Sequence, residues 1–336
     1  MDPAEDNTEN EASSQRERRV VRLVLRLLVL AALATIVASS IDVPETFGHL
    51  TGDTLVSIVA VQPLMAIALV LTGWRLALLA RPKAPPIFAA TKAVTLGLGF
   101  NVAIPGRLSE FIKAAYMRDN AQIPFSAALA AVVVERLADL VILGILSVTA
   151  VTFVFLEVNV WSGIAVVGVG VAAIAVLGHA DGVLRRFAGW FPHAGLRTFL
   201  DQLITNAAAH VRSGRIYGAL VIGIAAWAGG LGMIAGIVEM AGSIELGFGA
   251  LLAIYVATSI GSVLAALPAG FGTYEAAAVL CLTEFGYTAE EALALALAMH
   301  AAQFALTVPC AALILLLERI GIASLVRTAA AALRQA

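Results

Sequence analysis

The chain is built mainly from long apolar runs separated by short polar segments. Six runs continue without interruption near residues 20–41, 55–79, 124–156, 160–178, 216–240 and 288–317. A helix of about 20 apolar residues covers the roughly 30 Å hydrocarbon core of a bilayer. Each run therefore predicts a membrane-spanning helix, and together they predict an all-α, polytopic transmembrane bundle with six full spans.

Two further apolar stretches, 87–119 and 250–286, are interrupted by Pro and Gly. The first contains NVAIPGRLSEF from Asn101, and the second contains LPAGFGTYEAA from Leu267. Pro lacks a backbone donor and ends or kinks a helix, so each stretch predicts two short helical pieces joined at a break. These stretches are expected to be broken or re-entrant hairpins, and the pattern leaves open whether they cross the membrane fully.

The two broken stretches share one order of features. Each runs from an apolar helix through Pro and Gly to a Glu that begins a second helix. In the first stretch Glu110 lies 25 residues before Glu135. In the second, Glu275 lies 25 residues before His300, and each later residue sits on a long apolar helix. This matching spacing predicts an internal duplication.

Basic residues predict the orientation of the spans. Cytoplasmic loops of membrane proteins are enriched in Lys and Arg, and several Arg residues precede the first run. Alternation through the spans then places all 21 Lys and Arg residues on the cytoplasmic side, Arg75, Lys113 and Arg136 among them. The first broken stretch would enter from the cytoplasm and the second from outside. Inverted repeats with broken helices are typical of transporters.

The same assignment divides the chain into parts. Residues 1–19 are predicted to be a disordered cytoplasmic tail, residues 20–320 a single transmembrane domain, and residues 321–336 a cytoplasmic C-terminal tail. Residues 20–41 follow Arg residues and are expected to be an uncleaved signal anchor. Both termini would then be cytoplasmic, and the protein would lie in a bacterial inner membrane.

Composition narrows the classes of function. Hydrophobic residues make up 60% of the 336 residues and charged residues 13%, against roughly 45–50% and 25% in soluble domains. The formal net charge of −2 gives no reason to expect a nucleic-acid partner. Cys281 and Cys310 lie in apolar runs without metal-ligand spacing, so we expect packing residues, no metal and no other cofactor. No phosphate loop, HExxH, GxSxG or dinucleotide fingerprint occurs, so we expect neither catalytic residues nor an enzyme.

The helix breaks mark the candidate site. Lipid cannot satisfy the backbone groups that a break exposes, so breaks occur inside protein or beside a watery cavity. A helix N-terminus after a break suits a phosphate or a carboxylate, and a phospholipid headgroup would fit there. The candidate cavity residues are Asn101, Pro105, Gly106, Arg107, Glu110, Glu135, Arg136, Asp139, Pro268, Gly270, Gly272, Tyr274, Glu275 and His300. The alternative is that the breaks are solvated kinks in interfacial helices.

Charged residues also occur within the predicted spans. In VVVERLADLVIL, Glu135 and Asp139 share one helix face and Arg136 can pair with Asp139. Burial of all three would require pairing. The helix over 124–156 is longer than a bilayer needs, so an ion-pair cluster at the cytoplasmic interface is the alternative. His300 is either a hydrogen-bonded packing residue or a proton-handling group.

Three segments, NVAIPGRLSEFIKAAYM, PFSAALAAVVVERLADL and LPAGFGTYEAAAV, occur in this order. Together they resemble the lysylphosphatidylglycerol synthase transmembrane-domain family, also called flippase-like membrane proteins, over about residues 20–320. The positions that match the family's pattern are Pro105, Gly106, Arg107, Glu110, Glu135, Arg136, Asp139, Pro268, Gly270, Gly272 and Glu275. His300 stands where the resemblance leads us to expect an Arg.

The resemblance implies a membrane domain that moves or houses lipids such as aminoacylated phosphatidylglycerol. Stand-alone members include proteins associated with hopanoid lipids. Members that synthesise lysylphosphatidylglycerol carry a large soluble domain after the membrane part, whereas a short tail follows it here. We therefore expect no aminoacyl transfer.

These observations favour a lipid transporter or flippase for a polar-headgroup lipid. That lipid could be an aminoacylated or other phospholipid, a hopanoid or a lipid-linked glycan. Energy coupling is open, with Glu110, Asp139 and Glu275 as candidates for a proton or ion site. The alternatives are an enzyme of lipid or lipid-linked sugar modification with Glu110 or Glu135 as general base, or an accessory protein for lipid-modifying enzymes. Membrane lipids are the expected partners, while lipid-biosynthetic enzymes and a second copy of the chain remain open.

Overall fold

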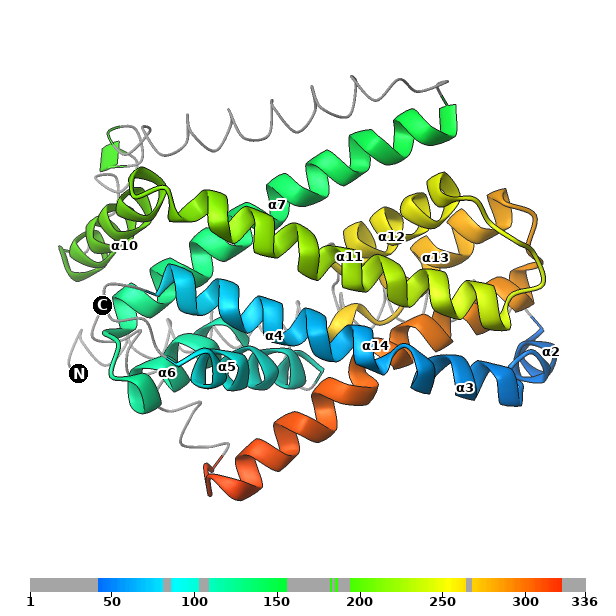
Figure 1. Cartoon of the computed structure of the whole chain (residues 1–336), viewed down its shortest axis with the longest axis horizontal. Helices are drawn as coiled ribbons and strands as arrows, with labels where there is room; N and C mark the ends of the chain where they lie inside the picture. The colour runs from blue at the N-terminus through cyan, green and yellow to red at the C-terminus, as the bar shows by residue number, and fades with distance from the viewer. Residues whose placement is uncertain are drawn as a thin grey trace, which may run out of the picture.

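Helices make up all the regular structure of the part of the chain that the computed structural model describes (Figure 1). That part comprises residues 42–80, 86–102, 109–155, 182, 185–186, 194–263 and 268–321. In chain order the elements are α2 (Val43–Gly48), α3 (Gly52–Ala60), α4 (Gln62–Leu79), α5 (Ile87–Asn101), α6 (Ser109–Ala121), α7 (Phe125–Phe155), α10 (Ala194–Arg212), α11 (Arg215–Ala241), α12 (Phe248–Val263), the 3-10 turn η1 (Pro268–Gly270), α13 (Thr273–Glu284) and α14 (Ala289–Leu317). The predicted all-α class is confirmed over these ranges.

Among the described residues, four helical segments are long and apolar enough to cross a membrane. They are Gly52–Leu79, which contains α3 and α4, Phe125–Val154 within α7, Arg215–Ala241 and Ala289–Leu317. They coincide with the spans predicted over 55–79, 124–156, 216–240 and 288–317, so the protein is a multi-pass membrane protein. The other two predicted spans, 20–41 and 160–178, lie outside the described residues, as do the predicted tails apart from Gly321.

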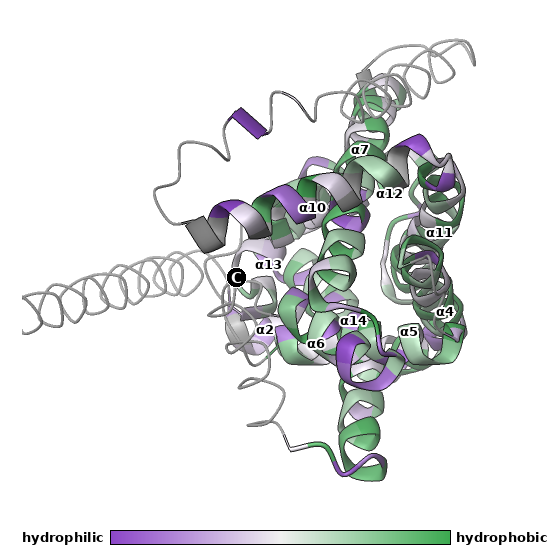
Figure 2. Ribbon diagram, turned by 90° about the vertical axis from the view of Figure 1, so that its left-hand side faces the viewer, coloured by the Kyte–Doolittle hydropathy of each residue, from purple (hydrophilic) through white to green (hydrophobic). Residues whose placement is uncertain are grey.

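The outer faces of the long helices carry large apolar side chains. Leu55, Leu140, Val221 and Leu316 are each more than half exposed. Figure 2 shows apolar colour along most of the helices, with hydrophilic stretches on α10 and at helix ends. In water such a surface would be unfavourable, whereas acyl chains solvate it without cost. The exterior therefore suits a lipid environment.

The two broken stretches lie at opposite ends of the bundle. Figure 1 shows the C-terminal ends of α4 and α14 toward the same side as the N-terminal ends of α7 and α11. The α5–α6 hairpin lies at this end, and the α12–α13 hairpin lies at the other. The inverted repeat of the two stretches, and the side of the membrane from which each would enter, stay predictions.

Helix packing follows a reciprocal pattern. The helix after each hairpin packs on the second helix of its own hairpin and on the first helix of the other hairpin. Thus α7 contacts α6 and α12, and α14 contacts α13 and α5. The helices that precede the hairpins, α4 and α11, pack extensively against each other. A two-fold relation between the two halves would produce this arrangement.

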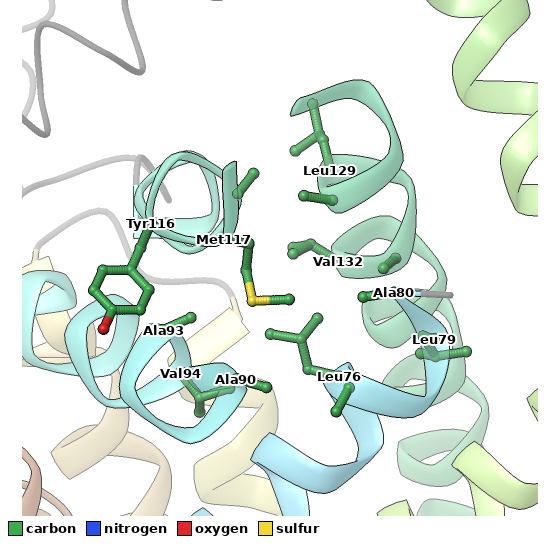
Figure 3. Close-up of a cluster of buried hydrophobic side chains, with 14 of the residues drawn as sticks. Leu76, Leu79, Ala80, Ala90, Ala93, Val94, Tyr116, Met117, Leu129 and Val132 are labelled. Carbon is green, nitrogen blue, oxygen red and sulfur yellow. The ribbon is translucent and has the colours of Figure 1, made fainter. Parts of the chain in front are cut away.

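The core of the first half forms where α4, α5, α6 and α7 meet (Figure 3). Met117 of α6 lies between Leu76 of α4 and Val132 of α7, all with almost no exposed surface. Many of the neighbouring positions are alanines, such as Ala90 and Ala93. Small residues let membrane helices approach closely, and this packing fixes the first hairpin against the two long helices.

The second break ends in a tight turn. Ala269 has φ +59°, and Gly270 and Gly272 have φ +88° and +85°. Such left-handed conformations are easy for glycine but cost an alanine about 1–2 kcal/mol. The preceding residues 264–267 and the first break at 103–108 lie outside the described residues. The backbone of the turn at 268–270 is therefore strained, and the surrounding structure must hold the turn in this conformation.

Candidate functional site

A cluster of charged side chains lies between α4, α6 and α7. This charged cluster consists of Arg75, Glu110, Lys113, Glu135, Arg136 and Asp139. Its three cations balance its three anions, so the cluster as a whole carries no formal net charge. Charges inside a membrane protein are tolerated where they pair with one another, and this cluster meets that condition.

Arg75 holds one side of the charged cluster. Its Nη1 and Nη2 donate to the two carboxylate oxygens of Asp139 at 2.6 and 3.2 Å. Nη2 also lies 3.3 Å from Oε1 of Glu135. Trp227 of α11 donates from its indole nitrogen to Asp139 at 3.1 Å. Two parallel bonds from one guanidinium fix the geometry of the carboxylate, and the Arg75 side chain is only 3% exposed.

Glu135 lies at the buried centre of the cluster. Its side chain has 0% exposure and meets Nζ of Lys113 at 3.3 Å and the guanidinium of Arg136. Lys113 also lies 3.0 Å from Glu110. Arg136 pairs with Asp139 at 3.2 Å, which confirms the predicted pairing on α7. With a side-chain exposure of 37%, Arg136 is the most accessible cation of the cluster.

Two glycines make room for the buried cations. A Cβ at Gly97 of α5 would stand 2.7 Å from a side-chain carbon of Lys113. At Gly223 of α11 a Cβ would stand 2.8 Å from Nη1 of Arg75. Real Cβ atoms essentially never approach this closely, so the long side chains cross these helices only where no side chain stands in the way.

A second polar site joins α13, α14 and the turn at 268–270. Nδ1 of His300 on α14 lies 2.6 Å from Oε1 of Glu275 on α13, and its Nε2 lies 3.2 Å from the carbonyl oxygen of Ala269. The other carboxylate oxygen of Glu275 accepts the backbone N–H of Gly272 at 2.7 Å. This contact satisfies a free donor at the start of α13, as the Glu of a capping box does.

Aromatic rings enclose His300. The Tyr274 ring stacks on the imidazole with centroids 4.2 Å apart, and the rings of Phe271 and Phe304 lie at 4.9 and 5.1 Å. The histidine side chain is 3% exposed. The Glu275–His300 pair is therefore shielded from water on most sides.

Two adjoining cavities lie between the broken stretches. The larger cavity, of about 340 Å³, is lined mainly by α4, α11, α12 and α14, and Arg75, Trp227 and Tyr274 of α13 are among its lining residues. The smaller, of about 260 Å³, is lined by residues of both broken stretches, among them Glu110 and Pro268. Lys113, Arg136 and Asp139 line both cavities. We refer to the two together as the central cavity.

Two residues that line the larger cavity carry buried polar atoms with unused hydrogen-bonding capacity. Nε of Arg75 and the hydroxyl oxygen of Tyr274 have no hydrogen-bond partner among the described residues. Buried polar groups normally find a partner in protein or ordered water. The capacity that remains here is available to water or to a polar ligand.

The structure brings most of the predicted site residues to one place. Asn101, Glu110, Pro268 and Gly270 line the smaller cavity, and Tyr274 lines the larger one. The last glycine, Gly272, starts α13 and is held by Glu275. Glu275 and His300 lie directly behind the wall that Ala269, Tyr274 and Phe304 form. Pro105, Gly106 and Arg107 lie outside the described residues.

The structure adds the direction of the charged side chains to the charge pattern. Glu135 is fully buried and paired within the bundle, while the position of this α7 cluster relative to the cytoplasmic interface stays a prediction. Arg75 and Lys113, which the charge pattern assigns to the cytoplasmic side, point into the interior with 3% and 2% exposure. The positive-inside rule counts charges along the chain and is blind to the direction in which a side chain points.

Sequence reasoning did not identify three members of the site, Arg75, Lys113 and Trp227. The sequence does indicate Arg75 as a candidate, because it lies inside the predicted span 55–79 and an ionisable residue within a span is a functional candidate. Lys113 follows Glu110 by one helical turn, which also indicates a pair. Trp227 lies among many apolar residues of α11, and only the fold brings its indole to Asp139.

Comparison with known proteins assigns the chain to a family. The model of the lysylphosphatidylglycerol synthase TM region matches residues 18–310. The chain belongs to this family. No curated protein and no solved structure is significantly similar to the chain.

Membership of the lysylphosphatidylglycerol synthase TM family agrees with the resemblance of the three motif segments, and the matched range contains both broken stretches and the charged cluster. The protein is therefore a multi-pass membrane protein whose membrane domain is related to lipid modification.

Proposed function

We propose that this protein is a lipid transporter of flippase type, which moves a polar-headgroup lipid between the two leaflets of a bacterial inner membrane. The observation that carries the proposal is the central cavity, which lies between two broken hairpins from opposite ends of the bundle. Transporter sites commonly lie at such junctions of discontinuous helices. The proposed orientation has both chain termini in the cytoplasm.

The charges of the cavity suit a polar headgroup. A charged group costs several kcal/mol or more to bring into hydrocarbon, and a cavity lined by Arg136, Lys113 and Asp139 would lower that cost. Arg136 is the cation most open to the cavity, so we assign it the phosphate of the headgroup. The carboxylates of Glu110 and Asp139 keep the site balanced and can meet an ammonium or hydroxyl group of the same headgroup.

The edge of the smaller cavity suits the acyl chains. Leu140 and Val263 line it, with 54% and 43% of their surfaces exposed. Apolar residues at this edge would let acyl chains stay in the bilayer while the headgroup moves through the polar interior. Among lipids, the proposal covers phospholipids including aminoacylated ones, hopanoids and lipid-linked glycans.

Reconstitution tests the proposal. Purified protein in liposomes is supplied with fluorescent lipids of several headgroups, and the fraction that reaches the outer leaflet is followed by quenching. We expect the protein to accelerate movement of at least one lipid class well above protein-free liposomes. Arg136→Gln keeps a polar side chain and removes the charge, and it should lower the rate by about ten- to a hundredfold, since one charged hydrogen bond contributes about 1.5–3 kcal/mol.

Lys92→Gln is the matched control, because Lys92 pairs with Glu318 away from the central cavity. This variant should transport lipid as the wild-type protein does. Equal rates for Arg136→Gln and wild type would refute the role of the cavity, and no movement of any lipid would refute the proposal. A chemically altered lipid in the same liposomes would instead favour an enzyme, and transport that requires a co-purified enzyme would favour an accessory protein.

A further inference from the structure

His300 contacts two acceptors at once. A backbone carbonyl oxygen only accepts hydrogen bonds, and so does an ionised carboxylate. A neutral imidazole has one N–H and can donate to one of them. The observed contacts to Glu275 and to the Ala269 carbonyl, at 2.6 and 3.2 Å, are therefore both satisfied only when the pair holds one additional proton.

The pair holds the same number of protons whichever of its two residues carries the additional one. Nε2–H donates to the carbonyl, and one proton lies between Nδ1 and Oε1 of the carboxyl group. The pair is then either a protonated carboxyl with a neutral imidazole or a carboxylate with an imidazolium, and its net charge is zero in both cases. After loss of this proton the Glu275–His300 pair carries one negative charge. In one of its two contacts an imidazole nitrogen lone pair then faces an oxygen atom, which is repulsive.

The equivalent pair in the first repeat cannot behave in this way. Glu135 occupies the position that corresponds to His300, and its partners are Lys113, Arg75 and Arg136. Arginine keeps its charge under all physiological conditions, whereas histidine changes its charge between about pH 5 and 8. The charged cluster therefore keeps two arginine charges at every physiological pH, whereas the Glu275–His300 pair contains a histidine and no arginine.

Few other ionisable groups face the Glu275–His300 pair. Among the described residues, Tyr274 of α13 stacks on it, and Tyr255 of α12 lies next to Tyr274. The charged residues of the surrounding helices point to solvent or have partners elsewhere: Asp53, Arg75, Glu284, Glu290 and Glu291. The charge of the pair is accordingly set by its own proton.

Ala269 connects the proton of the Glu275–His300 pair to the cavity wall, because its carbonyl contacts His300 and the residue itself lines the smaller cavity. This residue has the strained φ of +59° in the turn 268–270, and its carbonyl is held by His300. Pro268, Ala269 and Gly270 line the smaller cavity. A change in the contacts of His300 therefore acts directly on a strained segment of the cavity wall.

We propose that the Glu275–His300 pair is a proton-binding site whose loading holds the 268–270 turn against the central cavity and whose unloading releases it. In combination with the proposed transport function, on which this part rests, one proton taken up and released at this pair drives or gates the movement of one lipid headgroup. Proton binding itself is independent of what the cavity carries.

The first experiment measures proton binding without transport. Protein labelled with ¹⁵N-histidine is placed in lipid nanodiscs, and the His300 signals are assigned by their loss in His300→Gln. The His300 signals are followed across about pH 5 to 8, where histidine side chains ordinarily change their charge, and they should change from the proton-loaded to the unloaded pattern. Hydrogen exchange of the backbone amides of residues 269–272, corrected for intrinsic rates, should be slower in the loaded state. Unchanged His300 signals over this range would overturn the proposal.

The second experiment measures coupling in liposomes. The rate of lipid movement in wild type should vary with pH by up to about tenfold per pH unit, the limit for one proton. In Glu275→Gln the amide can donate to Nδ1 while Nε2–H donates to the Ala269 carbonyl, so a neutral imidazole satisfies both contacts without the additional proton. Both this variant and His300→Gln should therefore lose the pH dependence of the rate. His49→Gln removes an imidazole near α2 and should retain the wild-type dependence.

The two experiments separate the two proposals. A titrating His300 in a protein that moves no lipid would refute transport and leave the proton site standing. Lipid movement with the same pH dependence in wild type, Glu275→Gln and His300→Gln would refute the coupling, whatever the transport rate.

Discussion

Replacement of Arg75 by leucine removes one of the two almost fully buried cations of the charged cluster. The substitution removes the two hydrogen bonds to Asp139 and the contact with Glu135. Breaking a buried ion pair by removal of one partner costs about 3–5 kcal/mol. Asp139 keeps Trp227 and Arg136 as partners, so we expect a loss of unfolding free energy near the lower limit, about 3 kcal/mol.

A second substitution tests whether charge balance is the cause. Arg75→Leu alone leaves the cluster with two cations and three anions, whereas Arg75→Leu with Asp139→Leu leaves two of each. The double variant should therefore be more stable than the sum of the single effects predicts, by about 2 kcal/mol, within the range for directly contacting residues.

Equilibrium unfolding in mixed detergent micelles, followed by far-ultraviolet circular dichroism, measures these differences. Lys92→Leu is the control, because Lys92 and Glu318 form a pair with 25% and 23% exposure, and such pairs contribute about 0–1 kcal/mol. Additive single effects in the double variant, or wild-type stability of Arg75→Leu, would refute the view that the cluster is a balanced and buried unit.

Three further substitutions give expected outcomes in the same unfolding assay. Gly97→Ala should lower stability by about 1–3 kcal/mol, because its Cβ would collide with Lys113, and a wild-type value would mean that the lysine moves freely. Trp227→Phe should cost about 1.5–3 kcal/mol through loss of the bond to Asp139, and no change would show that the bond is replaced by water. Ala269→Gly should raise stability by up to about 1 kcal/mol, since it relieves the positive φ, and a large loss would contradict the strain.

The long spans could be predicted from the sequence because their signal is local. Apolar runs of bilayer length predict helices whatever their neighbours are, and 124–156 and 288–317 match α7 and α14 closely. The spacing from Glu110 to Glu135 and from Glu275 to His300 also followed from the chain alone. It indicated paired elements, although it could not show that Glu275 and His300 touch each other.

The candidate site was only partly predictable, since its electrostatics depend on which helices meet. Arg75 lies 60 residues before Glu135 along the chain, yet both belong to one cluster because α4 packs on α7. Its burial depends equally on Gly223 of α11, which leaves space for the guanidinium. Such contacts combine three separate helices, and no local pattern contains that information.

The sequence by itself determined that the protein is helical, that it resides in a membrane and that two Pro-Gly breaks interrupt its helices, because hydrophobicity and backbone chemistry act over a few residues. Only the tertiary structure decided that Glu135 is held by two arginines and a lysine while Glu275 meets a histidine. The charge environment of a buried group is set by side chains from other helices, so the packing alone distinguishes an ion cluster that contains arginines from a pair that contains a histidine.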